Sequence, residues 1–377
     1  MRLPFRVGIP SALLLSVLAT ADGAAQTRVF RAGGSDLLMG LGAANKAIAG
    51  AVVASTRDLY SVYWNPAGLA RIEGFQIGAS TAFRTEVYDV DFIGIAFGTD
   101  LLAPLGLKTG VALAYFPRLH VESEGQFDPD DFESLFIRFT LPFLPDDFDG
   151  TISSKTREVR LGIGVAPEEG GRWRVGFGVG YIDCTTLSCG VRASDPGNYF
   201  ATTTLAYSWG FYGGVQFDLG ERFTLGFIFR DPFTELNVEI ITEDVDGTRT
   251  EFFDVEFPKD LALGVEWRKS SNLTFYGTVQ RLAGTYGVSS IDISLLRSGV
   301  TLAAGEWDLA AGLMLQLRIA GTHFADLREE APFLPTLGIG RSIGSLDLFL
   351  AVYPDPAMTA HFNRPYMNLD LTVRLSF

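Results

Sequence analysis

The chain has 377 residues, of which 47% are hydrophobic, and its formal net charge is −14. An excess of acidic residues makes a poor partner for the phosphate backbone of a nucleic acid, so we expect no nucleic acid binding. Although the hydrophobic content is high, no stretch beyond the first 25 residues approaches the roughly 20 uninterrupted apolar residues that a membrane-spanning helix needs.

Residues 1–25 have the layout of a secretory signal peptide. Arg2 and Arg6 precede an apolar run from Val7 to Ala19, and small residues follow that run. We therefore expect export, with a mature chain that begins near Gln26 or a few residues earlier. The alternative, an uncleaved membrane anchor, is disfavoured because the apolar core is short.

Beyond residue 72 the apolar residues recur with a period of two, which is typical of β-strands. Several of these segments reach the roughly 9–11 residues that a tilted strand needs to cross a bilayer, whereas strands of soluble sandwiches average about 5–6. Fourteen strands are predicted, at 75–83, 90–98, 107–117, 156–166, 172–183, 199–217, 222–230, 259–268, 272–282, 292–303, 306–318, 334–341, 345–353 and 367–377.

The last segment, "MNLDLTVRLSF", shows the alternation best. Its apolar face suits lipid and its polar face suits water: the first consists of Met367, Leu369, Leu371, Val373, Leu375 and Phe377, and the second of Asn368, Asp370, Thr372, Arg374 and Ser376. Since lipid does not tolerate open sheet edges, such strands must close into a barrel. The sequence therefore predicts an all-β, transmembrane antiparallel barrel of about fourteen strands.

Short and long connectors alternate along the predicted barrel. The short ones include "PEEGG", "DLGE", "KSS", "AG" and "SIG", and the long ones reach 118–155, 184–198, 231–258 and 319–333. Bacterial outer-membrane barrels have short periplasmic turns and long outer loops. We therefore expect the outer membrane as the location and outer-membrane lipid as a partner. Glycines at alternate positions, such as Gly176, Gly178 and Gly180, are expected to face the lumen and make room there.

The loop at 118–155 is unusually aromatic for a segment outside a barrel. Its residues Phe132, Leu135, Phe136 and Phe139 share one face at helical spacing, and Phe143 follows. Three interpretations remain open: a lid packed on the barrel rim, a surface that captures a hydrophobic ligand, and a docking patch for a protein. The third predicted strand, which precedes this loop, is expected to end at Pro117.

Catalysis and metal binding have little support in the sequence. The three histidines, His120, His323 and His361, are far apart and lack Ser or Asp at motif spacing. Cys184 and Cys189 are the only cysteines, and in an exported chain they favour a small disulfide over two free thiols. We therefore predict that the protein is not an enzyme and has no cofactor, no catalytic residue and no metal site.

A segment of small residues, "MGLGAANKAIAGAVVAS", then "RDLYSVYWNPAGLA", alternating strands and a terminal Phe together resemble the FadL-type outer-membrane family. Only residues 39–72 match at the level of a motif. The resemblance implies a hatch at 26–72 that folds into a barrel at 73–377, with the hatch motif at Asn65, Pro66, Ala67 and Gly68. Phe377 stands where outer-membrane barrels carry a C-terminal signal, which implies the barrel assembly machinery as a partner.

The resemblance also implies a function, for which two possibilities stay open. The first is a channel for passive uptake of hydrophobic small molecules, either long-chain fatty acids or hydrocarbons. The second is a PorV-like adaptor, a barrel that docks secreted or envelope proteins and transports nothing itself. A general polar porin is disfavoured because a hatch would obstruct its pore.

Overall fold

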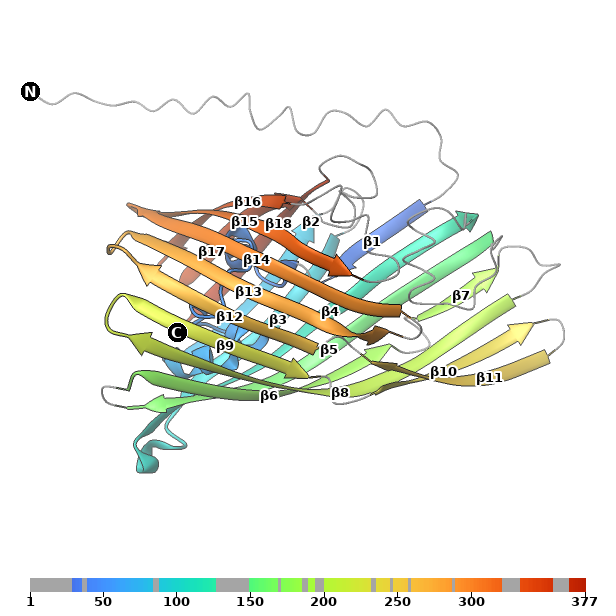
Figure 1. Ribbon diagram of the computed structural model, residues 1–377, viewed down its shortest axis with the longest axis horizontal. Helices are drawn as coiled ribbons and strands as arrows, with labels where there is room; N and C mark the ends of the chain where they lie inside the picture. Colours follow the sequence, from blue (N-terminus) through green and yellow to red (C-terminus); the bar gives the residue numbers. More distant parts are fainter. Residues whose placement is uncertain are drawn as a thin grey trace, which may run out of the picture.

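The computed structural model describes residues 29–35, 39–83, 88–126, 149–168, 171–184, 189–193, 200–231, 235–244, 247–256, 259–286, 289–320, 333–354 and 366–377. These residues form one antiparallel β-barrel, with strands that run obliquely along its longest dimension (Figure 1). Within them, no helix is long and apolar enough to cross a membrane.

Fourteen of the 18 strands form the ring of the barrel. Each pairs antiparallel with the next, and the last pairs with the first, so the ring has no open edge. The ring consists of β2 (Phe75–Phe83), β3 (Tyr88–Thr99), β4 (Leu107–Gln126), β5 (Asp149–Pro167), β6 (Trp173–Cys184), β8 (Phe200–Leu219), β9 (Phe223–Asp231), β12 (Lys259–Arg268), β13 (Leu273–Tyr286), β14 (Ser289–Ala304), β15 (Trp307–Ala320), β16 (Phe333–Ile343), β17 (Leu346–Pro354) and β18 (Met367–Ser376).

All fourteen predicted strands are therefore confirmed, although several are longer than expected. The clearest correction concerns β4, which does not end at Pro117 but continues to Gln126 along β5. A bulge that skips Arg118 accommodates the proline, because the register shifts there by one residue.

Four further strands lie where the sequence predicted connecting loops or the hatch. They are β1 (Val29–Ser35), β7 (Cys189–Ala193), β10 (Glu235–Asp244) and β11 (Gly247–Glu256). β7 continues the line of β6 between β5 and β8, and β10 continues the line of β9 along β8. These strands carry the sheet beyond the end of the barrel opposite to the short turns (Figure 1).

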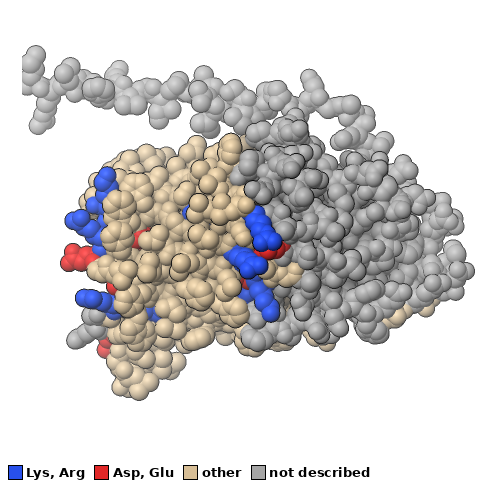
Figure 2. Space-filling model, in the orientation of Figure 1, with Lys and Arg blue, Asp and Glu red and all other residues tan. Residues whose placement is uncertain are grey.

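The outer face of the barrel is apolar and the inner face is mixed. In β12 the exposed positions include Leu261, Leu263, Val265 and Trp267, whereas Asp260 and Glu266 are buried in the interior. β18 shows the same division, which confirms the face assignment made from its sequence. An uncharged surface covers most of the visible described part of the barrel (Figure 2), as expected of a wall that faces lipid.

The interior of the barrel is filled on the side of the short turns. Residues 39–72 of the predicted hatch lie there inside the ring (Figure 1), and we call them the hatch below, whereas residues 29–35 of the same prediction form β1 beside β4. They contain two short α-helices, α2 (Ala43–Ala47) and α3 (Ser61–Trp64), and the 3-10 helix η1 (Pro66–Arg71). A second 3-10 helix, η2 (Ala103–Leu105), lies in the turn between β3 and β4.

Candidate functional site: the hatch and its seat in the barrel

The motif Asn65-Pro66-Ala67-Gly68 lies where the hatch touches the wall. The side chain of Asn65 accepts a hydrogen bond from the Ala67 amide at 3.1 Å, which caps η1, and it donates to the carbonyl of Val53 at 2.7 Å. It also donates to the carbonyl of Val215 on β8 at 3.2 Å. One amide thus joins two hatch segments to the barrel.

Glycines of the wall admit the backbone of the hatch. A Cβ atom at Gly176 of β6 would overlap the backbone of Pro66, and one at Gly110 of β4 would overlap the carbonyl of Leu69. Gly178 and Gly180 face the interior on the same strand as Gly176, as the sequence predicted. The same close approach recurs around the ring, at Gly164, Gly226, Gly299 and Gly312. Backbone therefore packs against backbone, which seals the hatch to the wall.

Lys46 of α2 holds the hatch to three wall strands through a buried charge cluster. Its ammonium lies 2.7 Å from Asp91 of β3 and 3.1 Å from the hydroxyl of Tyr353 on β17, and it also contacts Asp370 of β18. Tyr353 donates in turn to Asp370 at 3.0 Å. Burial lowers the pKa of Lys46, but Asp370 and Asp91 outweigh that effect and raise the pKa well above its usual value.

A second set of wall residues binds hatch carbonyls. Arg230 of β9 donates to the carbonyl of Tyr63 at 2.6 Å, and Arg160 of β5 donates to the same carbonyl at 3.3 Å. Arg297 of β14 donates to the carbonyl of Ala49 at 2.9 Å. Carbonyl groups that would lack a partner inside the barrel are thereby satisfied.

These arginines belong to a polar network along neighbouring strands. Arg297 donates to Gln280 at 2.9 Å, Gln280 donates to Asp260 at 2.9 Å, and Asp260 pairs with Arg230 at 2.7 Å. Because each partner is fixed by the next, the donors are held in position against the carbonyl groups of the hatch.

An aromatic cluster lies where the hatch meets β3 and β4. Tyr60 of the hatch packs on Phe92 in a tilted arrangement with ring centroids 4.4 Å apart, and Tyr63 meets Phe116 edge to face at 5.3 Å. All four rings are buried. The guanidinium of Arg160 lies over both Tyr63 and Phe116, at 5.3 and 5.0 Å from the ring centroids.

The wall changes its pairing beside this aromatic cluster. Among the described residues, the ladder between β3 and β4 runs from Thr99↔Thr109 to Ile93↔Tyr115 and goes no further. Past that point β3 pairs with β2, while β4 pairs with β5 and, from Leu119 to Glu124, with β1. The two neighbouring ladders each contain a bulge near the point where β3 and β4 stop pairing. Asp91 is the extra residue between β2 and β3, and Arg118 is the extra residue between β4 and β5.

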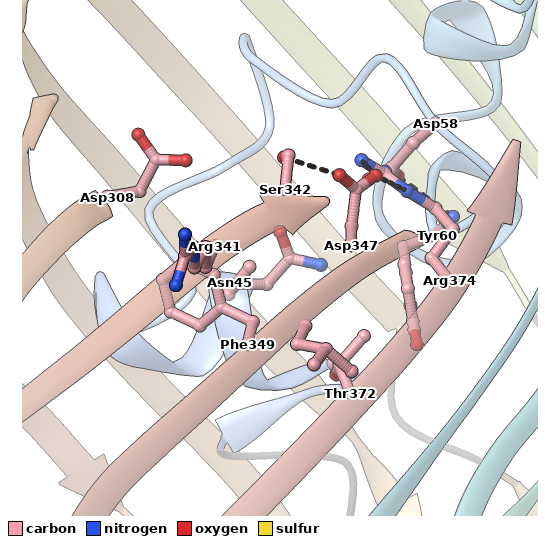
Figure 3. Close-up of a pocket in the computed structure, with 13 residues that line it drawn as sticks. Asn45, Asp58, Tyr60, Asp308, Arg341, Ser342, Asp347, Phe349, Thr372 and Arg374 are labelled. Atoms are coloured by element: carbon pink, nitrogen blue, oxygen red, sulfur yellow. Dashed lines mark hydrogen bonds and ion pairs between the residues drawn. The ribbon is translucent and has the colours of Figure 1, made fainter. Parts of the chain in front are cut away.

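A small pocket of about 180 Å³ opens between the hatch and β15 to β18 near the short turn after β16 (Figure 3). Arg374 lies between Asp58 and Asp347, whereas Asp308 stands apart. The remaining lining includes Asn45, Tyr60, Arg341, Ser342, Phe349 and Thr372. A pocket this small, with five charged side chains in its lining, does not suit a hydrophobic ligand, since such sites are larger and contain few charged groups.

The predicted capture residues Phe132, Leu135, Phe136, Phe139 and Phe143 lie outside the described residues. Cys184 ends β6 and Cys189 begins β7. On β5, Arg157 pairs with Asp183 and Ser154 pairs with Cys189. The disulfide between Cys184 and Cys189 stays a prediction. Phe377 exchanges two backbone hydrogen bonds with Phe75 at the seam of the ring.

The sequence analysis missed the charged residues that hold the hatch. A signal for them existed, because Asp370 and Arg374 stand on the polar face of a strand whose other face is apolar, and Lys46 stands alone among small apolar residues. Among the described residues, no group of three or more His, Cys, Asp or Glu side chains is arranged to hold a metal ion.

Neither protein-family models nor curated protein sequences match this chain. Solved structures do match it, at low identity. The toluene transporter TbuX of Ralstonia pickettii has a TM-score of 0.58 and 13% identity, over 90% of this chain and 99% of that one. The toluene transporter TodX of P. putida has a TM-score of 0.55 and 13% identity, with the same coverage.

A third structure, the monoaromatic hydrocarbon channel CymD, gives a TM-score of 0.56 and 13% identity over 90% of this chain and 98% of that one. At such identities the likeness shows a shared fold. The expected FadL-type fold, a fourteen-stranded barrel with an internal hatch, is confirmed. A barrel of this kind with an apolar outer wall belongs to the bacterial outer membrane.

Proposed function

We propose that the protein is an outer-membrane channel for passive uptake of hydrophobic small molecules, with the hatch as its gate. The proposal divides the chain into a signal peptide at 1–25, a hatch at 26–72 and a barrel at 73–377. The hydrocarbon channels TbuX, TodX and CymD share the fold, which supports this class of substrate.

The observation that carries the proposal is the aromatic cluster of Tyr60, Tyr63, Phe92 and Phe116. Two of its rings belong to the hatch and two belong to the wall, at the level where β3 and β4 cease to pair. A movement of the hatch would separate the rings and expose their apolar surface to a hydrophobic molecule in the lumen. We therefore assign the gate to this contact.

One observation favours the second possibility, an adaptor that docks envelope or secreted proteins. The hatch is bound to the wall by Lys46, Arg160, Arg230 and Arg297 on several sides, which is the arrangement expected of a plug that stays closed. An adaptor needs no passage through its barrel. The channel remains the better supported function because the solved structures that share the fold, TbuX, TodX and CymD, are hydrocarbon transporters or channels.

Uptake into cells that lack their own hydrophobic channel tests the proposal. Expression of this protein should raise the uptake of radiolabelled oleate or of radiolabelled toluene. Uptake of oleate would identify fatty acids as the substrate class, and uptake of toluene would identify hydrocarbons. The adaptor possibility is tested in the same cells by quantifying the proteins that co-purify with the barrel. Uptake of neither compound, together with a stoichiometric protein partner, would make the adaptor the function.

A further inference from the structure

Two arginines lie on the outer face of the barrel, where apolar residues are the rule. Arg281 of β13 and Arg318 of β15 both pair across the sheet with Ser294 of β14, so the three residues form one row. The side chains of Arg281 and Arg318 are 59% and 61% exposed.

A bulge places Arg318 on this face. Along β15 the outward residues alternate with buried ones, so that Leu315 faces outward and Met314 and Gln316 are buried. Arg318 would follow Gln316 into the interior if the alternation continued. The register shift opposite Ser294 leaves Leu317 without a pairing partner on β14, and Leu317 and Arg318 are therefore both exposed.

The level of the two arginines matches one edge of the membrane. Trp307 begins β15 beside a short turn, and ten regular steps of about 3.3 Å lead from it to Arg318. With the usual barrel tilt of about 40°, this length spans roughly 25 Å along the membrane normal, which is the height of the apolar band. Arg318 thus stands at the end of the band that is remote from the short turns.

Among the described side chains around Ser294, two positive charges face one negative charge, although the chain as a whole is acidic. Asp292 of β14 accepts from Arg281 at 2.9 and 3.2 Å and lies 3.4 Å from Arg318, so one carboxylate serves two guanidinium groups. Lys259, at the end of the apolar row of β12, is exposed on the same face. Figure 2 shows a group of Lys and Arg side chains at the inner edge of the uncharged surface.

We propose that Arg281 and Arg318 bind a phosphate group of a glycolipid in the outer leaflet of the membrane. Each guanidinium keeps N–H donors beyond those directed at Asp292, and their planar geometry matches two phosphate oxygens. Asp292 holds the two guanidinium groups in one row, which leaves the pair ready for a single anion. The long side chains reach from the wall to the level of the headgroups.

Native mass spectrometry of the purified full-length protein with bis-phosphorylated lipid A as the probe tests this assignment. The double variant R281S/R318S should retain about tenfold less lipid A than the unchanged protein, because two charge-assisted contacts are lost. The matched control is R172S/R222S, which removes two exposed arginines from the short turns. The control should bind lipid A like the unchanged protein.

A second comparison uses the unchanged protein and replaces the probe by dephosphorylated lipid A. The unchanged protein should bind it about as weakly as R281S/R318S binds the phosphorylated form, whereas R281K/R318K should bind the phosphorylated form at an intermediate level. Equal binding of both lipids to the unchanged protein would overturn the assignment, as would equal loss in R172S/R222S. Displacement of lipid A by millimolar inorganic phosphate would overturn the choice of a lipid as the source of the phosphate.

Discussion

Buried charged residues hold the hatch to the barrel wall. Lys46 is neutralised by Asp91 and Asp370, and its ammonium remains protonated at neutral pH because its pKa is raised. Such a cluster adds little net stability compared with apolar packing, but the loss of one member is costly. Its value lies in fixing where α2 sits on β3, β17 and β18.

We expect Lys46→Met to destabilise the seated hatch by about 3–5 kcal/mol, because two buried carboxylates lose their cation. Hydrogen exchange of the amides in residues 43–50 should accelerate, while exchange in the barrel strands stays the same. The triple variant K46M/D91N/D370N also removes the charges of both carboxylates and should recover part of the protection. Unchanged exchange in Lys46→Met would mean that the cluster does not hold the hatch.

A glycine of the wall provides a second prediction at this scale. Gly176→Ala should loosen the hatch by about 1–3 kcal/mol, since the added Cβ overlaps the backbone of Pro66. Gly213→Ala is the matched control, because the nearest atom to its Cβ lies 3.7 Å away. Limited proteolysis should cleave the hatch faster in the first variant and not in the second. Equal rates in both variants would contradict the direct backbone seal.

Among whole elements, the barrel strands could be predicted because lipid on one face imposes a contrast at every second residue. β12 shows this contrast from end to end, and its predicted bounds agree with the structure. β11 and the outer end of β4 read "GTRTEFFDVE" and "RLHVESEGQ", with no such contrast. Beyond the membrane the two faces of a strand no longer differ in solvent, so the pattern that reveals a strand disappears.

The seat of the hatch could not be predicted because its contacts are distant in sequence. Lys46 is separated from Asp91 by 45 residues and from Asp370 by 324. Alternation tells which face of a strand is inward, but it does not tell which inward residues stand at the same level. The motif around Asn65 indicated a plug, whereas its partners on β8 became apparent only from the register of the ring.

Fixing the hatch to a wall strand tests whether it gates. The hydroxyl of Thr372 on β18 accepts from the Ala43 amide at 2.8 Å, so cysteines at both positions should be within disulfide reach. In a background of C184S/C189S, oxidation of A43C/T372C should abolish uptake, and a reductant should restore it. Single-cysteine variants are the controls. Uptake that persists after complete oxidation would exclude movement of α2 from the transport step.

For the molecule as a whole, closure of the ring depends on its two ends. Phe377 and Phe75 exchange backbone hydrogen bonds, and their rings lie 6.2 Å apart at the seam between β18 and β2. Backbone groups at an open seam would face lipid without partners, at a cost of several kcal/mol each. Phe377 therefore completes the hydrogen bonding at the seam, and we propose that its ring also serves as a signal for assembly of the barrel.

Removal of Phe377 should lower the amount of folded barrel in the outer membrane several-fold, since the seam is weakened and the proposed C-terminal signal is lost. The shift in electrophoretic mobility between unheated and heated samples measures the folded fraction. Phe377→Tyr keeps the ring and the backbone bonds and should assemble like the unchanged protein. An unaffected folded fraction after the deletion would show that neither contribution limits assembly.

The glycine-lined seal has a consequence for the order in which the protein is built. The hatch precedes every strand of the ring in the chain, yet its seat is made of strands from β3 to β18. The full set of backbone contacts exists only when those strands stand side by side. We therefore expect the hatch, although it precedes the ring in the chain, to complete its packing only after the last strand has joined.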